Sequence, residues 1–191
     1  KLLIAQAAAE NATALSGNVS ALEAALPQDL SAGEISVRLG ATWLPEDVIQ
    51  QFMVELIQPS YYARDRIKVH YMPLMGSWNV TEKNADRSNV HSFNTYGTQR
   101  MNAYKIIEES LNLRDVRVFD YVEDADGKRK AGLNKKETAI AQAKQKIIRS
   151  KFEEWVWSDP ARRERLCRLY NDKFNSIRPR VYNGDHLRFP G

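Results

Sequence analysis

Apolar residues recur at helical spacing in several stretches of the chain, and each stretch predicts an amphipathic helix with one buried face. The first stretch begins at Pro45, continues through Val48, Phe52 and Leu56, and ends before Pro59. Proline suits the first position of a helix but cannot continue one, so the two prolines mark the expected bounds. This helix is expected to be part of the core.

Several further stretches before residue 130 carry a clear pattern. The alternation in residues 67–72 predicts a strand, and residues 76–80 are its expected hairpin partner. A second helix is expected between Thr98, as its N-cap, and Asn112. Its apolar face is expected to consist of Tyr104, Ile107 and Leu111. Residues 116–122 are rich in β-formers, and the turn signal at residues 124–127 follows them.

The last third of the chain predicts two long helices in sequence. Asn134 is the expected N-cap of the first, with Glu137 three residues on, and this helix continues to about Trp157. Asp159 is the expected cap of the second, with Pro160 at its first position. The first helix is expected to bury Ile140, Ile147, Ile148, Phe152, Trp155 and Val156. The second is expected to bury Leu166, Leu169, Tyr170, Phe174 and Ile177.

The order of these elements predicts an α+β fold, with a small, mostly antiparallel sheet, packed helices and a C-terminal amphipathic helix pair. Residues 1–29 are Ala-rich and are expected to form a helical linker or peripheral segment. Residues 30–191 are expected to form one α+β domain, with basic helices at 134–178. The chain begins with Lys1 and ends on Phe189-Pro190-Gly191, so we expect it to be a piece of a longer protein.

Charge is distributed very unevenly along the chain. Residues 128–191 carry 17 basic and 7 acidic side chains, whereas the rest of the chain has a net charge of −6. Basic side chains bind nucleic acid by neutralising phosphates and releasing counterions, so this third of the chain is the candidate DNA-binding region. The candidate contact residues are Lys128, Arg129, Lys130, Arg149, Lys151, Arg162, Arg163, Arg165, Arg168 and Lys173.

A second hypothesis remains open for the same residues. The basic helices could instead dock on an acidic protein surface, in which case the domain is an interdomain scaffold without DNA contact of its own. The two hypotheses differ in one structural respect: DNA binding requires one continuous exposed basic face, whereas a scaffold allows the basic side chains to be paired with Asp and Glu. The aromatic residues of the helices are expected to lie in the core rather than to stack on bases.

The sequence contains no familiar catalytic motif. It lacks a phosphate-binding loop, a dinucleotide fingerprint and a nucleophile elbow. The histidines at positions 70, 91 and 186 have no metal-site spacing, and the single cysteine excludes an internal disulfide. The acidic cluster around Asp120 is expected to be a solvated turn. A weaker alternative is a nuclease-like site there, with a lysine and a divalent metal.

No apolar run approaches the roughly 20 residues of a membrane span, and no signal peptide is recognisable. We therefore expect a cytoplasmic location and no membrane partner.

Several short motifs, in order, resemble one segment of very large bacterial and phage proteins. The earlier motifs are residues 38–45, 96–98, 100, 102–103 and 111–113. The later motifs are residues 152–155, 162–164, 169–175 and 185–191. Those proteins join an N6-adenine DNA methyltransferase region to an SNF2-like superfamily II helicase region, and the chain resembles the segment between the two regions.

This resemblance implies a non-catalytic bridging domain, with DNA and the flanking methyltransferase and helicase domains as partners. It implies S-adenosylmethionine and ATP with Mg²⁺ as cofactors of the parent protein, and none for this segment. No catalytic residue of either region is carried over to the chain. Such fusions are typical of phages and mobile elements, where they serve DNA modification, restriction or defence against restriction. The implied location is the cytoplasm of a bacterial or phage-infected cell.

Overall fold

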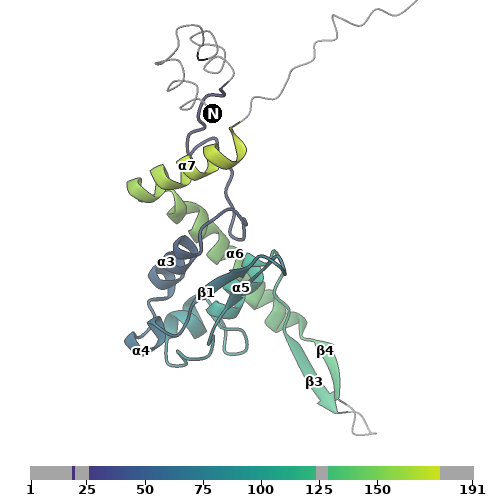
Figure 1. The fold of residues 1–191 in the computed structure, drawn as a ribbon. Helices are drawn as coiled ribbons and strands as arrows, with labels where there is room; N and C mark the ends of the chain where they lie inside the picture. Colours follow the sequence, from purple (N-terminus) through teal and green to yellow (C-terminus); the bar gives the residue numbers. More distant parts are fainter. Residues whose placement is uncertain (1–18, 20–25, 124–128, 177–191) are drawn as a thin grey trace, which may run out of the picture. The chain divides into compact units, whose positions relative to one another are not determined.

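The computed structural model describes residue 19, residues 26–123 and residues 129–176. Its fold is α+β, as predicted, and Figure 1 labels most of its elements. The elements up to α5 are α3 (Glu46–Ile57), α4 (Tyr61–Arg64), β1 (Val69–Met72), β2 (Ser77–Val80), the π-helix η2 (His91–Thr95) and α5 (Ala103–Leu111). The remaining elements are β3 (Phe119–Glu123), β4 (Arg129–Leu133), α6 (Lys135–Val156) and α7 (Pro160–Phe174).

The chain divides into two compact units. The larger is Ser36–Arg163, and the smaller combines Lys1–Ile35 with Glu164–Gly191. The predicted boundary after residue 29 stays a prediction. In the described part of the smaller unit, the side chain of Asn171 donates to the carbonyl of Leu30 over 2.9 Å and accepts from the backbone amide of Leu30 over 2.8 Å. These two bonds hold the segment before Ile35 against α7.

Helices α3 and α6 share an aromatic core in the larger unit. The ring of Phe52 on α3 meets the ring of Phe152 edge to face, with centroids 5.1 Å apart, and Trp155 lies 5.3 Å from the same ring. Edge-to-face pairs stabilise a core beyond the area they bury. The predictions that Phe52 and Phe152 are core residues are confirmed, because both are fully buried.

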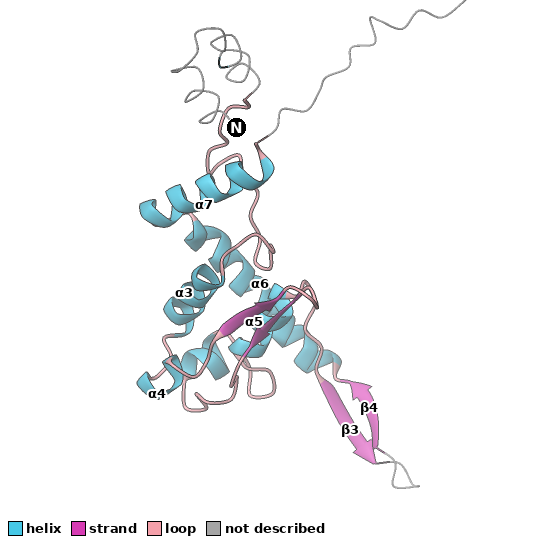
Figure 2. Cartoon of the chain, in the orientation of Figure 1, coloured by secondary structure: helices cyan, strands magenta, loops and turns pink. Residues whose placement is uncertain are grey.

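The β1–β2 hairpin has the predicted antiparallel pairing, with Tyr71 opposite Trp78. Figure 2 shows this hairpin as one of two separate strand pairs. A two-stranded sheet leaves both outer edges with free backbone groups, and side chains of the neighbouring helices satisfy them here. On the β1 edge, Glu46 accepts from the amide of Tyr71 over 2.7 Å, and Gln50 accepts from the amide of Val69 over 2.9 Å.

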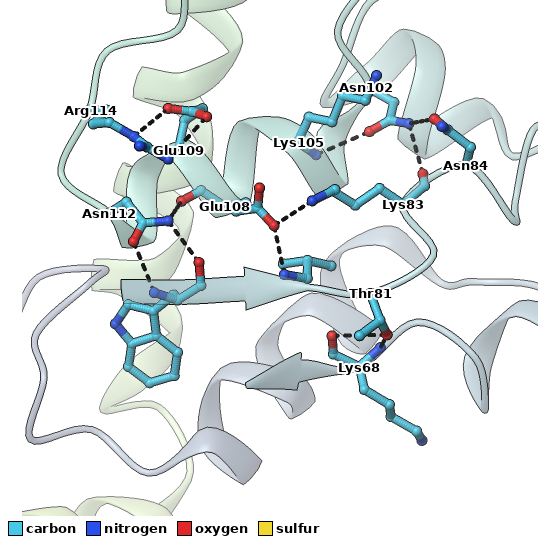
Figure 3. Close-up of polar contacts among 12 residues, drawn as sticks. Lys68, Thr81, Lys83, Asn84, Asn102, Lys105, Glu108, Glu109, Asn112 and Arg114 are labelled. Carbon is cyan, nitrogen blue, oxygen red and sulfur yellow. Dashed lines mark hydrogen bonds and ion pairs between the residues drawn. The ribbon is translucent and has the colours of Figure 1, made fainter. Parts of the chain in front are cut away.

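The β2 edge is closed in the same way by α5, as Figure 3 shows. Glu108 accepts from the amide of Val80 over 2.7 Å and from Lys83 over 2.6 Å. Asn112 accepts from the amide of Trp78 over 2.9 Å and donates to its carbonyl over 2.9 Å. The hairpin is therefore bound to a helix along each side.

The predicted strand over residues 116–122 is shorter than expected. Strand β3 begins at Phe119, and the backbone before it bonds to side chains of α6 instead of to another strand. Gln145 accepts from the amide of Val116 over 3.2 Å, and Thr138 accepts from the amide of Val118 over 3.0 Å. Because these buried polar side chains satisfy the backbone, Val116 and Val118 pack into the core without a partner strand.

The N-cap of α5 also differs from the prediction. Asn102, and not Thr98, caps the helix, because its side chain accepts from the amide of Lys105 over 3.0 Å. Thr98 closes a turn just before the helix, where its hydroxyl accepts from the amide of Met101 over 3.0 Å. Among the described residues, no helix is long and apolar enough to cross a membrane.

Candidate functional site

Helix α6 carries two of the candidate residues, Arg149 and Lys151, and α7 carries five. The start of α6 is set by the sequence. Asn134 accepts from the amide of Glu137 over 2.9 Å, which confirms the predicted N-cap. The helix then runs for 22 residues. Its buried residues are Thr138, Ala141, Gln145, Ile148, Phe152 and Val156. They recur at three- and four-residue spacing, so they form one face, and the opposite face of α6 is turned to solvent.

Two residues that were predicted to be buried lie on this outer face. Ile140 is 41% exposed and Ile147 is 44% exposed, so the prediction is wrong for both. At about 100° per residue, Ala141 and Ile148 occupy the core face, and Ile140 and Ile147 cannot share it. The sequence pattern fits both faces, because each carries apolar residues at helical spacing.

The exposed isoleucines are part of a regular stripe, here named the α6 seam. The α6 seam consists of Lys136, Ile140, Ala143, Ile147 and Ser150, all exposed. Successive members are alternately four and three residues apart, which keeps them in line along the helix. Lysines flank the apolar centre of the seam on both sides. They are Lys144, Lys146 and Lys151.

The predicted contact residues Arg149 and Lys151 are both paired with carboxylates. Arg149 lies 3.5 Å from Asp115, and Lys151 lies 2.9 Å from Glu154. The hydrogen bond to Glu154 raises the pKa of Lys151. Arg149 lines an open hollow that also holds Arg38, Asp115 and Glu153, so positive and negative side chains balance there.

Arg162 does not fit its predicted role as a DNA contact. It is only 7% exposed, and its guanidinium lies over the ring of Trp155. It donates to the carbonyls of Val156 over 3.1 Å and Trp155 over 2.7 Å. These carbonyls lie at the end of α6, where the Trp155 carbonyl also accepts from the amide of Ser158 over 3.1 Å, and Arg162 acts as a structural cap at the turn into α7. Burial lowers its pKa, against the raising effects of Asp159 and Glu55.

The other four predicted residues of α7 are exposed. They are Arg163, Arg165, Arg168 and Lys173. Arg168 lies 3.2 Å from Asp172, one turn along the helix. Phe174, which was predicted to face the core, is 58% exposed, and its ring contacts that of Tyr170.

The basic triplet at the β3–β4 hairpin is only partly within the described residues. Lys130 is exposed on β4, whereas Lys128 and the side chain of Arg129 lie outside the described part. The predicted turn at residues 124–127 lies outside it as well. Asp120, at the base of the hairpin, accepts hydrogen bonds from Arg100 and from Asn134, and both lower its pKa. Asp120 therefore fixes the hairpin to the start of α6.

The nuclease-like alternative requires a divalent metal ion held near Asp120. The described residues contain no group of three His, Cys, Asp or Glu side chains that could hold a metal ion. Asp124 and Asp126 lie outside the described residues, and so does the side chain of Glu123.

The described basic residues thus do not form one uninterrupted basic face. Three of the predicted contacts are paired with carboxylates and a fourth is buried. Three exposed lysines of α6 that are not among the predicted DNA contacts have no ion pair within the described part. They are Lys135, Lys136 and Lys146. The four–three spacing of the α6 seam is the sequence signal that could have identified the surface.

The described elements define a small α+β domain in which a long helix exposes a lysine-flanked apolar stripe. A family model described as a domain of unknown function (DUF8437) matches residues 38–176, and the chain belongs to that family. The match covers all the described helices and strands of the larger unit. No curated protein and no solved structure matches the chain.

Proposed function

We propose that the chain is a non-catalytic bridging domain that holds neighbouring protein domains together through the outer face of α6. The α6 seam is the observation that carries this proposal. Ile140 and Ile147 expose large apolar surfaces one above the other on the same face. Fully burying an isoleucine side chain stabilises a complex by about 1.5–3 kcal/mol, so covering two half-exposed ones contributes a sizeable part of a docking free energy.

The ion pairs of the basic residues also favour protein docking over DNA binding. DNA binding calls for cations that are free to contact phosphates, and Arg149, Lys151 and Arg168 instead lie beside carboxylates. Cations on an apolar stripe are typical of the rim of a protein interface, where they select the partner by charge.

The resemblance of the motifs to large phage and mobile-element proteins supports a particular setting. In that setting the chain joins the methyltransferase and helicase regions of one DNA methyltransferase–helicase fusion in the bacterial cytoplasm. S-adenosylmethionine, ATP and Mg²⁺ serve the flanking regions, and the bridging domain itself uses no cofactor. Its role in modification, restriction or defence against restriction follows from the regions that it holds together.

A scattering experiment on the fusion protein tests the proposal. The double substitution Ile140→Asn/Ile147→Asn removes the apolar centre of the α6 seam. We expect the radius of gyration of the fusion to increase, because the docked neighbour is released. Tyr61→Asn/Tyr62→Asn is the matched control, since these side chains are 81% and 83% exposed on α4. An unchanged radius in the seam variant would contradict the proposal.

Contact with the DNA backbone is a second candidate function, favoured by one observation. Lys135 and Lys136 occupy the first turn of α6, where the positive end of the helix dipole disfavours cations. Neither has an ion pair in the described part of the chain, and the same holds for the exposed Lys146. A phosphate group near these residues would be attracted by the lysines and by the dipole together.

A titration with labelled duplex DNA at several salt concentrations tests this second function. The triple substitution Lys135→Gln/Lys136→Gln/Lys146→Gln is expected to weaken binding and to reduce the salt dependence by about 0.9 per lost phosphate contact. The seam variant Ile140→Asn/Ile147→Asn keeps these lysines and is expected to bind DNA as the wild type does. Absence of binding at low ionic strength would rule out DNA contact by this chain.

A further inference from the structure

We propose that the partner of the α6 seam is an acidic amphipathic helix, which packs along α6 as in a two-stranded coiled coil. This inference rests on the proposed docking function and adds the chemistry of the partner. The alternating spacing of four and three residues is that of the a and d positions of a heptad repeat. Ile140 and Ile147 are then at a, and Ala143 and Ser150 are at d.

The side chains at these positions suit a close helix contact. β-Branched isoleucine at a is the residue that favours two-stranded packing, and small residues at d allow the two backbones to approach. From Lys136 to Ser150 the seam is about 21 Å long at 1.5 Å per residue, which is the length of two heptads. A partner helix of that length meets every member of the seam.

The flanking positions specify the charge of the partner. In this register Lys144 and Lys151 are at e and Lys146 is at g, whereas the first e and g positions carry Glu137 and Ala139. Residues at e and g form the salt bridges between the helices of a coiled coil and decide which helices pair. Glutamate or aspartate at the facing positions of the partner would pair with all three lysines.

The environment of each lysine agrees with this role. Lys146 is exposed, and Lys144 donates to the carbonyl of Thr95 over 2.9 Å, which orders its side chain beside the seam. Lys151 is paired with Glu154 on its own helix, so a partner carboxylate would share this lysine with Glu154. In a parallel second copy of α6, Lys146 at g would face Lys151 at e, and this like-charge pair disfavours a parallel homodimer.

The test is a fluorescence anisotropy titration of the 191-residue chain with two synthetic peptides. Each is a labelled peptide of three identical heptads, with isoleucine at a and leucine at d; one has glutamate at e and g and its twin has lysine there. We expect the glutamate peptide to bind at least about tenfold more tightly than the lysine twin, with an affinity that falls as salt rises. Ile147→Asn is expected to weaken binding at least about tenfold, because it places an amide in the apolar seam.

Charge reversal provides the decisive variants. Lys144→Glu/Lys146→Glu/Lys151→Glu is expected to reverse the preference, so that the lysine twin binds more tightly. Because Lys144 and Lys151 make contacts within the chain, Lys146→Glu alone is the second variant, and it is expected to reduce the preference for the glutamate peptide in the same direction. Equal binding of both peptides to the wild type, or no binding of either, would overturn the proposal.

Other outcomes separate this inference from the proposed function. If neither peptide binds but Ile140→Asn/Ile147→Asn still expands the fusion in scattering, the docking function stands and the acidic helix is wrong. A dimer in sedimentation that Ile147→Asn dissociates would assign the seam to a second copy. Displacement of the glutamate peptide by duplex DNA, with loss of DNA binding in Ile147→Asn, would assign it to nucleic acid. Each of these results overturns the acidic helix.

Discussion

The guanidinium carbon of Arg162 lies 3.5 Å from the centroid of the Trp155 ring. The same guanidinium donates to two carbonyls at the end of α6 and to the hydroxyl of Ser158 over 3.2 Å. The buried Arg162 side chain thus stabilises the turn between α6 and α7 through a cation–π contact and by capping the carbonyls. The arginine that the charge pattern singled out as a DNA contact is therefore a structural residue.

Replacing this side chain tests its role. Arg162→Met keeps the apolar stem but removes the charge and the donors, and we expect a loss of about 2 kcal/mol in the free energy of unfolding. Chemical denaturation measures the loss. Arg163→Met is the control: this neighbour is exposed, and we expect a change within about 0.5 kcal/mol. Equal effects of the two substitutions would contradict the structural role of Arg162.

Tyr104 predicts how stability depends on alkaline pH. Burial, the negative charge of Asp86 and the hydrogen bond to Asp86 together raise the pKa of the Tyr104 hydroxyl well above its usual range. In the unfolded chain this tyrosine ionises near pH 10, whereas in the folded chain it stays protonated. The unfolded state therefore loses a proton that the folded state keeps, and stability decreases as pH rises through 10 and above.

The expected contribution is a decrease of up to about 1.4 kcal/mol per pH unit above pH 10, measured by denaturation at a series of pH values. Tyr104→Phe has no ionisable group, so its stability should decrease less steeply over the same interval. Tyr62→Phe, at an exposed position of α4, serves as the control substitution. Parallel slopes for the wild type and Tyr104→Phe would show that Tyr104 ionises as readily in the folded chain as in the unfolded chain, which would contradict the expectation.

Gly40 allows two parts of the backbone to approach closely. Its φ is +98°, and a Cβ at this position would lie 2.4 Å from the carbonyl oxygen of Leu111. Gly40→Ala is expected to cost about 3 kcal/mol or more, from the strained conformation and the steric clash together. Gly76 has a φ of +60° with nothing within 4 Å, so Gly76→Ala should cost only about 1 kcal/mol. Thermal unfolding of both variants measures the difference.

Ser92 offers a substitution that should not destabilise the fold. It is fully buried, and its hydroxyl oxygen has no hydrogen-bond partner among the described residues. An unsatisfied buried hydroxyl costs about 1–3 kcal/mol, so Ser92→Ala should be neutral or stabilising. Chemical denaturation should compare this variant with Ser110→Ala. The Ser110 hydroxyl donates to the carbonyl of Ile106 over 2.7 Å, so its loss should destabilise the fold. A loss of stability in Ser92→Ala as large as that in Ser110→Ala would contradict the expectation.

The local signals in the sequence predicted the elements well where the stabilising contacts are themselves local. The cap of α6 at Asn134 depends on residues three positions apart, and the bounds of α3 depend on Pro45 and Pro59. The N-cap of α5 was assigned wrongly because Thr98 and Asn102 both carry suitable oxygens, and only the folded turn decides between them.

The orientation of α6 could not be predicted in the same way. Its core face includes the polar residues Thr138 and Gln145, which bond to the backbone before β3. A hydrophobic pattern discounts such residues and therefore favours the competing face with Ile140 and Ile147. Because Ile140 and Ile147 were assigned to the core, the exposed apolar seam between the lysines was not among the candidate surfaces. Long-range hydrogen bonds, which single-sequence patterns do not contain, decide the orientation.

Photocrosslinking from the centre of the α6 seam tests the central claim most directly. A benzophenone amino acid at position 143 in the fusion protein places the reactive group between Ile140 and Ile147. The docking account predicts, by mass spectrometry, a single crosslinked protein segment that is acidic and helical, and its loss when Ile140 and Ile147 are replaced by Asn. The same label at the exposed Tyr62 should give no such product. Absence of any crosslinked protein from position 143, or crosslinks to DNA, would contradict the account.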